Sequence, residues 1–260
     1  MNLLNKIKEN TALRSIFIVV ITGMSFPVTG IIILLVGGNP LQAFTALLEG
    51  SFGSGRALTE TVLLATPLLL IGLGLVLAFR CQTWNIGAEG QYIIGGLGAI
   101  WVGLTWGSSL PSIILIPMML LMGLVGGASW ATIPGILKAK LGISEIVVSL
   151  MLNFVAFFGL SYIVRVPLKN PDYYLPQTAQ LGMAARLPKI LDSRIHIGVL
   201  IALLGVAFVN FILWRTTFGY ELRAVGENAV AAQSAGIKVD QSIVSVMAFS
   251  GAFAGLAGAI

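Results

Sequence analysis

The sequence predicts an all-α protein, a polytopic bundle of transmembrane helices, and two observations support this fold class. First, 57% of the 260 residues are hydrophobic and only 10% are charged, whereas ordinary soluble domains carry about 25% charged residues. Second, the apolar runs continue unbroken for about 20 residues, the length of a helix that crosses the hydrocarbon layer. A transmembrane β-barrel would instead show alternating segments of roughly 10 residues.

About seven apolar segments are predicted to span the membrane, at residues 15–37, 58–79, 91–106, 111–137, 146–166, 195–214 and 243–260. The first is expected to be a retained span, because its apolar run is long and no small-residue cleavage site follows it. The last segment stops without a flanking charge or aromatic anchor. We therefore expect the single transmembrane domain of residues 1–260 to be incomplete at its C-terminus.

Basic residues set the predicted orientation. Most Lys and Arg residues lie at the ends of apolar segments, and the connections that share a side with the N-terminus carry more of them. This distribution predicts a cytoplasmic N-terminus, with the inside connections at 80–90, 138–145 and 215–242. The formal net charge of +5 is scattered along the chain and forms no phosphate-binding stripe, so no nucleic-acid partner is expected.

The outside connections are predicted at 38–57, near 107–111, and at 167–194. The last of these contains four prolines and two tyrosines. Loops of this length are uncommon unless they have a function, so we expect an extracytoplasmic cap that includes a short helix; a passive connector is the alternative. Within the spans, the GxxxG pairs Gly123/Gly127 and Gly251/Gly255 predict close helix packing.

The sequence excludes several classes of chemistry. It contains one cysteine and one histidine, Cys81 and His196, so neither an intramolecular disulfide nor a multi-cysteine metal site can form. It lacks a GxxxxGK[ST] phosphate loop and the usual hydrolase motifs. We therefore expect no enzyme activity, metal or cofactor in this chain, and an interfacial anchoring role for His196.

The polar stretch RCQTWNIGAEGQ, residues 80–91, is unusual in so apolar a chain. Gly87 and Gly90 would allow the backbone to break there, and irregular backbone at membrane depth requires cover by protein or water. The side chains then either line a solute path or satisfy the freed backbone groups. Candidate path residues in this stretch are Trp84, Asn85, Glu89 and Gln91.

Other polar residues at the spans have two interpretations each. Asn153, in the middle of its span, either bonds to a neighbouring helix or faces an aqueous path, and we include it among the path candidates. Glu60 and Glu145 begin their spans, where a carboxylate meets the positive end of the helix dipole, and a structural role is expected for both.

The 215–242 connection is predicted to contain short helices. Asn228 is expected to cap a helix over residues 229–235, with Gly236 as its terminator, and GYELRAV forms another turn before it. The alanine-rich helix could enter a groove on another protein at close range.

Two stretches resemble a known family. TWNIGAEGQYIIGGLGA (83–99) and GYELRAVGENAVAAQSAGIKV (219–239) are similar to permease subunits of ABC importers for simple sugars and nucleosides, a branch that includes ribose and branched-chain amino-acid permeases. The NIGAEGQ form is most similar to one of the two permeases of nucleoside importers. The family has further spans beyond a segment like 243–260.

The resemblance implies a bacterial cytoplasmic-membrane importer with several partners. These are a cytoplasmic ATPase, a second permease in a heterodimer, and an extracytoplasmic substrate-binding lipoprotein or protein. The solute would be a nucleoside or a simple sugar. The resemblance also implies a coupling role toward the ATPase for Glu221, Arg223, Ala224, Gly226, Asn228, Ala231, Ala232 and Gly236.

Two other functions remain open. An ion-coupled secondary transporter of a small polar solute could use Glu89 as its proton-carrying carboxylate. A structural or assembly subunit would transport nothing, and it would leave the polarity of residues 80–91 without a purpose.

Overall fold

The computed structural model describes residues 11–171, 173–190 and 194–260, with side chains described from residue 23 onward. In this part of the chain the fold is helical, and the β pairing is limited to an isolated antiparallel bridge between Lys189 and His196. The chain forms two compact units, Met1–Thr61 and Val62–Ile260. The predicted all-α class is confirmed.

The first unit contains helices α2 (Thr11–Leu35) and α3 (Pro40–Phe52) and the start of α4 (Gly55–Arg80). The Gly23–Leu35 part of α2 and helix α3 are bent by 118° relative to each other. Asn39 caps α3 by accepting hydrogen bonds from the backbone N–H groups of Leu41 and Gln42, and Pro40 follows as the first helical residue. The connection predicted at 38–57 therefore contains a helix that was not predicted from the sequence, because Asn39 and Pro40 begin α3 within it.

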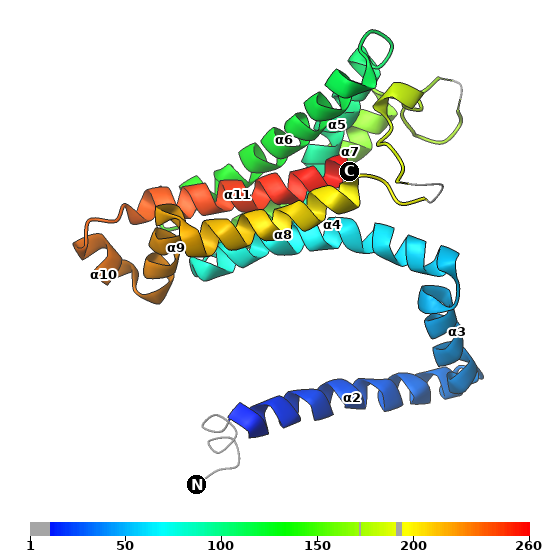
Figure 1. Cartoon of the computed structure of the whole chain (residues 1–260), viewed down its shortest axis with the longest axis horizontal. Coiled ribbons are helices and arrows are strands. Elements are labelled where there is room, and N and C mark those ends of the chain that lie inside the picture. The colour runs from blue at the N-terminus through cyan, green and yellow to red at the C-terminus, as the bar shows by residue number, and fades with distance from the viewer. Residues whose placement is uncertain (1–10, 172, 191–193) are drawn as a thin grey trace. The chain divides into compact units, whose positions relative to one another are not determined.

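The second unit continues α4 and contains most of the remaining elements (Figure 1). Along the chain these are α5 (Ala88–Trp106), α6 (Ser112–Leu141), α7 (Glu145–Arg165), the 3-10 helix η1 (Met183–Ala185), α8 (Gly198–Arg215), α9 (Thr217–Glu227), α10 (Ala229–Ser234) and α11 (Val239–Ala259). Most of the predicted spans match these helices to within a few residues. Glu60 does not begin its span, because α4 already starts at Gly55.

Five helices among the described residues are long and apolar enough to cross a membrane, namely α4, α6, α7, α8 and α11. The bent pair α2–α3 makes six if it is counted as one span. The predicted segment 91–106 forms α5, which is not one of the five. Glu89 and Gln91 in its first turn, together with its glycines, reduce its apolar character.

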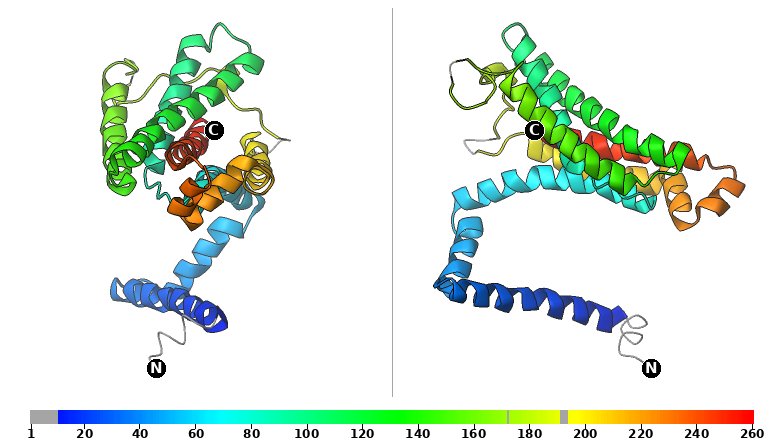
Figure 2. Two further views of the ribbon diagram at one scale, coloured as in Figure 1. Left: turned by 90° about the vertical axis from the view of Figure 1, so that its left-hand side faces the viewer. Right: turned by 180° about the vertical axis from the view of Figure 1, so that it is seen from behind.

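Helix α11 occupies the centre of the second unit and has the largest buried share of the five spans. In Figures 1 and 2 it lies between the α5–α6 pair on one side and α8 on the other. Small residues bring these helices together. A Cβ atom added to Gly127 would lie 2.1 Å from the Gly251 carbonyl oxygen, and one added to Gly255 would lie 2.1 Å from the Gly123 carbonyl oxygen. The two predicted GxxxG pairs therefore pack against each other.

Two apolar clusters complete the core of this unit. The larger joins α4, α8, α9, α10 and α11 and includes Leu77, Leu213, Leu222 and Val246. The smaller joins α5, α6 and η1. Helices α9 and α10 are thus attached to the transmembrane helices through buried side chains, and η1 is the short helix expected in the 167–194 connection.

Candidate functional site

The connector at residues 81–87 separates α4 from α5 and is the centre of the candidate site. It leaves α4 through Gln82, whose φ of 53° is left-handed, and the backbone N–H of Thr83 donates back to the Ala78 carbonyl. From there burial alternates along the connector, with one residue facing the protein and the next facing outward. The inward set is Cys81, Thr83, Asn85 and Gly87, and the outward set is Gln82, Trp84 and Ile86.

An amide network lies on the inward side of the connector. The Asn85 and Gln91 side chains exchange two hydrogen bonds, of 2.9 and 2.8 Å. The Asn85 amide nitrogen also donates to Ser250 Oγ of α11 at 2.8 Å, and the Asn85 oxygen accepts from the Gly87 backbone N–H at 3.0 Å. Asn85 thereby uses both of its donors and both of its acceptor positions while only 3% exposed.

Asn153 of α7 holds the outward side of the same connector. Its oxygen accepts a hydrogen bond from the Gly90 backbone N–H at 2.9 Å, and its nitrogen donates to the Ile86 carbonyl at 3.0 Å. Of the two interpretations of Asn153, the structure shows the bond to a neighbouring segment. Gly90 does not break the backbone as expected, because it lies inside α5. A Cβ atom there would lie 2.9 Å from the Asn153 oxygen, so the glycine provides room for this contact.

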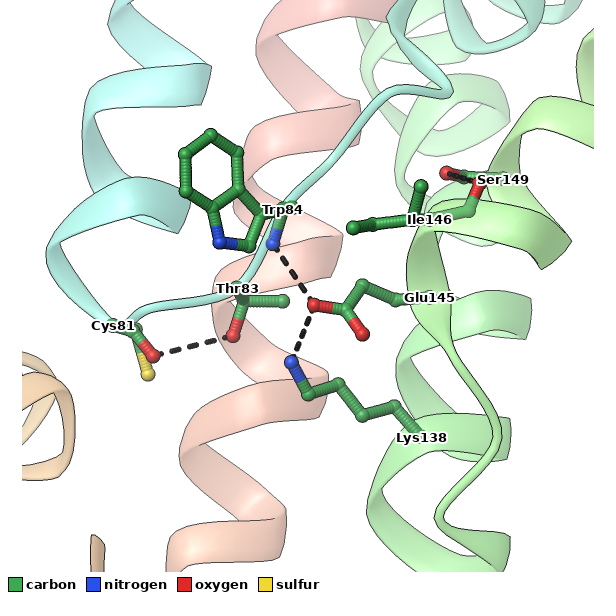
Figure 3. Close-up of polar contacts among 7 residues, drawn as sticks. All are labelled: Cys81, Thr83, Trp84, Lys138, Glu145, Ile146 and Ser149. Atoms are coloured by element: carbon green, nitrogen blue, oxygen red, sulfur yellow. Dashed lines mark hydrogen bonds and ion pairs between the residues drawn. The ribbon is translucent and has the colours of Figure 1, made fainter.

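A third anchor comes from the turn between α6 and α7 (Figure 3). Helix α6 ends at Gly142, which adopts the left-handed conformation, and α7 begins at Glu145. The Glu145 carboxylate accepts a hydrogen bond from the Trp84 backbone N–H at 3.1 Å and forms an ion pair with Lys138. Glu145 is 6% exposed, so the structural role expected for this carboxylate agrees with its contacts.

Glu89 behaves differently from the amides around it. Its side chain is exposed, and it borders a groove of about 320 Å³ between α5 and α7. The groove is lined by Glu89, Leu150, Asn153, Phe154, Phe157 and Phe158, and we name it the Glu89 groove. Of the five path candidates, Glu89 and Trp84 face outward, Asn85 and Gln91 are buried within the unit, and Asn153 lines the groove with its amide engaged by the backbone.

The predicted coupling residues lie on α9, α10 and the turn that follows. Asn228 caps α10 by accepting from the N–H groups of Val230 and Ala231, at 3.0 Å each. Gly236 has a φ of +88°, as expected for a helix terminator. Within α10, Ala232 is buried against the core while Val230 and Ala231 are exposed. The predicted capped helix is confirmed, and its exposed face consists of small side chains together with Val230 and Gln233.

Helix α9 is bound to the ends of α4 and α8. The Arg223 guanidinium lies 4.5 Å from the centre of the Trp214 ring of α8, and the Arg80 guanidinium of α4 lies 5.7 Å from the same ring. A Cβ atom on Gly226 would lie 2.0 Å from the Arg80 carbonyl oxygen. Gly226 therefore allows α9 to touch the backbone of α4 directly before the connector begins.

Some residues of the site had no clear signal in the sequence. Ser250 is one of several small residues in α11, and nothing in its local pattern indicates that it accepts a hydrogen bond from Asn85. Lys138 looked like an ordinary charged residue at a helix end. The aromatic run Phe154, Phe157 and Phe158 was visible as apolar, but its place beside Glu89 depends on how α5 packs against α7.

The described part of the 167–194 connection contains η1, which packs through Ala185 against α5 and α6. His196 follows this connection and accepts a hydrogen bond from the Gly198 backbone N–H at the start of α8. Burial lowers the pKa of His196 below its ordinary value. Residues 172 and 191–193 lie outside the described residues.

Comparison with known proteins identifies the family. The family model described as branched-chain amino acid transport system, permease component, matches residues 57–260. The guanosine ABC transporter permease protein NupP of Bacillus subtilis (strain 168) is 38% identical over 250 residues, which cover 94% of this chain and 70% of that protein.

Two further relatives extend the comparison. The glucose ABC transporter permease protein TsgB13 of Haloferax volcanii is 35% identical, over 89% of this chain and 63% of that protein. The guanosine ABC transporter permease protein NupQ of Bacillus subtilis is 31% identical, over 77% of this chain and 65% of that protein. This chain therefore spans between 63% and 70% of the length of these relatives. No solved structure gave a significant match.

These matches confirm the resemblance found in residues 83–99 and 219–239. They agree with a helical chain in which five of the described helices are long and apolar enough to cross a membrane. The chain is a multi-pass membrane protein and belongs to the family of permease components of branched-chain amino acid transport systems.

Proposed function

We propose that this chain is a permease subunit of an ATP-binding cassette importer in the bacterial cytoplasmic membrane, forming the path for a nucleoside or a simple sugar. The observation that carries the proposal is the family match over residues 57–260 together with the 38% identity to a guanosine permease. The guanosine permease, 38% identical over 94% of this chain, supports a nucleoside, and the glucose permease, 35% identical over 89%, supports a simple sugar.

The proposed partners follow from the same comparison. ATP hydrolysis would occur in a separate cytoplasmic ATPase, because the sequence has no phosphate-binding loop. A second, different permease would complete the path, since the chain is similar to both NupP and NupQ of one organism and clearly more to the first. A substrate-binding lipoprotein or protein would deliver the solute from outside. This chain would hold no catalytic residue and no cofactor.

In the proposed mechanism, α9 and α10 are the coupling element on the cytoplasmic face. The exposed face of α10 would contact the ATPase. A push on this face would reach α4 and α8 directly, because Gly226 touches the Arg80 carbonyl and Arg223 covers Trp214. Arg80 leads into the connector, whose anchors lie on α7 and α11. Motion of α9 would thus act on the connector, which lies beside the proposed path. Such a bundle would have two arrangements, and the ATPase would shift the balance between them from a distance.

We further propose a division of roles among the path candidates. Glu89 and Trp84 would face the path, because both side chains are exposed. Asn85, Gln91 and Asn153 would support it by satisfying the broken backbone, because their polar groups already bond to each other or to the connector.

Reconstitution tests the function. The full-length permease, with its partner permease, ATPase and binding protein, would be placed in proteoliposomes and assayed for uptake of labelled nucleosides and sugars. We expect nucleoside uptake that requires hydrolysable ATP. Uptake by the isolated permease driven by a proton gradient would contradict the proposal and favour the ion-coupled transporter.

The coupling role is tested at Val230, which is 74% exposed on α10. Val230→Asp places a charge on the proposed contact face, and we expect it to abolish co-purification of the ATPase while membrane insertion is unchanged. Tyr174→Asp, at a 99% exposed residue of the 167–194 connection, is the control and should retain the ATPase. Gly226 is unsuitable for this test, because any side chain there also disturbs the packing of α9 on α4.

A further inference from the structure

Glu89 lies in the first turn of α5, with its carboxylate side chain exposed on the surface of its own unit. Its neighbour Gly90 is hydrogen-bonded to Asn153, which lies eight residues after the first residue of α7, or about 12 Å along the helix. Within the part of the chain whose side chains are described, no group forms a hydrogen bond or an ion pair with the Glu89 carboxylate. We infer from the position of Asn153 that Glu89 lies inside the membrane, where a charged side chain faces water or a partner and not lipid, because its cost in hydrocarbon is high.

The surroundings of Glu89 are aromatic. Phe154, Phe157 and Phe158 line the Glu89 groove and are between 53% and 66% exposed. The rings of Phe157 and Phe158 lie edge to face, with their centroids 5.7 Å apart. The groove therefore combines flat apolar surfaces with one group that can only accept hydrogen bonds while it is ionised.

The groove is also preformed. Asn153 bonds to the backbone of both Ile86 and Gly90, and these two bonds join α7 to the connector and to the first turn of α5. The volume of the Glu89 groove, about 320 Å³, lies at the lower end of the range for small-molecule sites. A groove of this size has room for a single planar ring system.

From this geometry, and resting on the proposed function, we propose that the Glu89 groove is a solute subsite that receives the base of a guanine nucleoside. The Watson–Crick edge of guanine presents two adjacent donors, the ring N1–H and the exocyclic amino group, which match the two oxygens of a carboxylate. The phenylalanine rings supply the stacking surface. Uracil presents one ring N–H between two carbonyl oxygens, which a carboxylate repels, and a free sugar lacks the flat ring.

Thiol labelling tests whether the Glu89 groove is accessible to water and which solute it binds. Cys81 is the single cysteine and is 3% exposed, so Cys81→Ala gives a cysteine-free background. In membrane vesicles holding the complete transporter, Phe157→Cys in this background should react with a water-soluble thiol reagent. Guanosine should slow the reaction, and uridine and ribose should not. Phe211→Cys on α8, at another exposed phenylalanine, is the control and should not be protected.

A second variant tests the role of the carboxylate. Adding Glu89→Gln to the Phe157→Cys chain should raise the guanosine concentration that gives half-protection roughly tenfold, as expected for losing a charge-assisted hydrogen bond. Glu49→Gln, at an exposed glutamate of α3, should leave that concentration unchanged.

Several outcomes would overturn the proposal. Absence of labelling at Phe157→Cys would mean that the groove faces lipid or the second permease. Equal protection by guanosine, uridine and ribose would remove the guanine specificity. If Glu89→Gln leaves the guanosine concentration for half-protection unchanged, the carboxylate does not recognise the guanine base. Because the labelling needs no ATP, it decides the ligand of the groove even where ATP-driven uptake fails, so the two proposals can fail separately.

Discussion

Asn85 shows why an amide occupies the centre of the connector. The position needs two donors, toward Gln91 and Ser250, and two acceptor positions, toward Gln91 and the Gly87 N–H. An aspartate has the same shape but no donor while it is ionised, and a serine is too short. The residue type is therefore dictated by the number and direction of hydrogen bonds and not by polarity alone.

Asn85→Asp is expected to destabilise the chain by on the order of 3 kcal/mol, because it buries a carboxylate that cannot donate to Gln91 or Ser250. Thermal unfolding of the purified protein in detergent measures this loss. Asn228→Asp is the matched control and should change stability little, since aspartate caps helices as well as asparagine does. Equal unfolding temperatures for the two variants would contradict the importance of the buried network.

At the scale of elements, glycine determines how closely the helices can approach. Gly127 of α6 and Gly159 of α7 are both helical, yet their surroundings differ. A Cβ atom on Gly127 would meet the backbone of α11 at 2.1 Å, whereas one on Gly159 would have no neighbour within 4 Å. Close contact between α6 and α11 therefore depends on the missing side chain at position 127.

We expect Gly127→Ala to destabilise the protein by about 1–3 kcal/mol, because the added methyl group forces α6 and α11 apart. Gly159→Ala should be neutral or slightly stabilising, since alanine has the higher helix propensity. Unfolding temperatures of the two purified variants give the comparison. A Gly127→Ala variant as stable as the Gly159→Ala variant would contradict the packing described for these helices.

The elements that the sequence predicted well are those with a long apolar run. The runs at 58–79, 111–137, 146–166, 195–214 and 243–260 all form helices of nearly those limits, because hydrocarbon thickness sets a minimum length. Helix α10 was predicted from its cap and its terminator. Helix α3 was not predicted, although Asn39 and Pro40 form a capping signal at its start. Pairing across the bundle, such as Asn85 with Ser250, was not predictable because it joins residues 165 positions apart.

At the scale of the whole molecule, the two ends of α8 carry different structures. The 167–194 connection precedes its first residue, and α9 and α10 follow its last. The predicted orientation places the first of these outside the cell and the second in the cytoplasm. The orientation itself stays a prediction, because a helical bundle of this kind has the same internal contacts in either direction.

Side-specific labelling checks this orientation. In the Cys81→Ala background, Tyr174→Cys should react with a membrane-impermeant thiol reagent added to intact cells. Val230→Cys should react only after the membrane is opened, or in inverted vesicles. Both positions are highly exposed in the isolated chain, at 99% and 74%, so the chain is labelled without its ATPase, which would cover Val230. The reverse pattern would invert the predicted topology and remove the cytoplasmic role of α10.

The amide network of Asn85, Gln91 and Ser250 has an electrical consequence for the complete transporter. Its members are neutral, and the Lys138–Glu145 pair beside it carries no net charge. Moving one elementary charge through 100 mV involves about 2.3 kcal/mol, but rearranging these anchors would move none. The membrane voltage would therefore act little on a rearrangement confined to these anchors, which suits the proposed transporter, powered by ATP hydrolysis in a partner subunit.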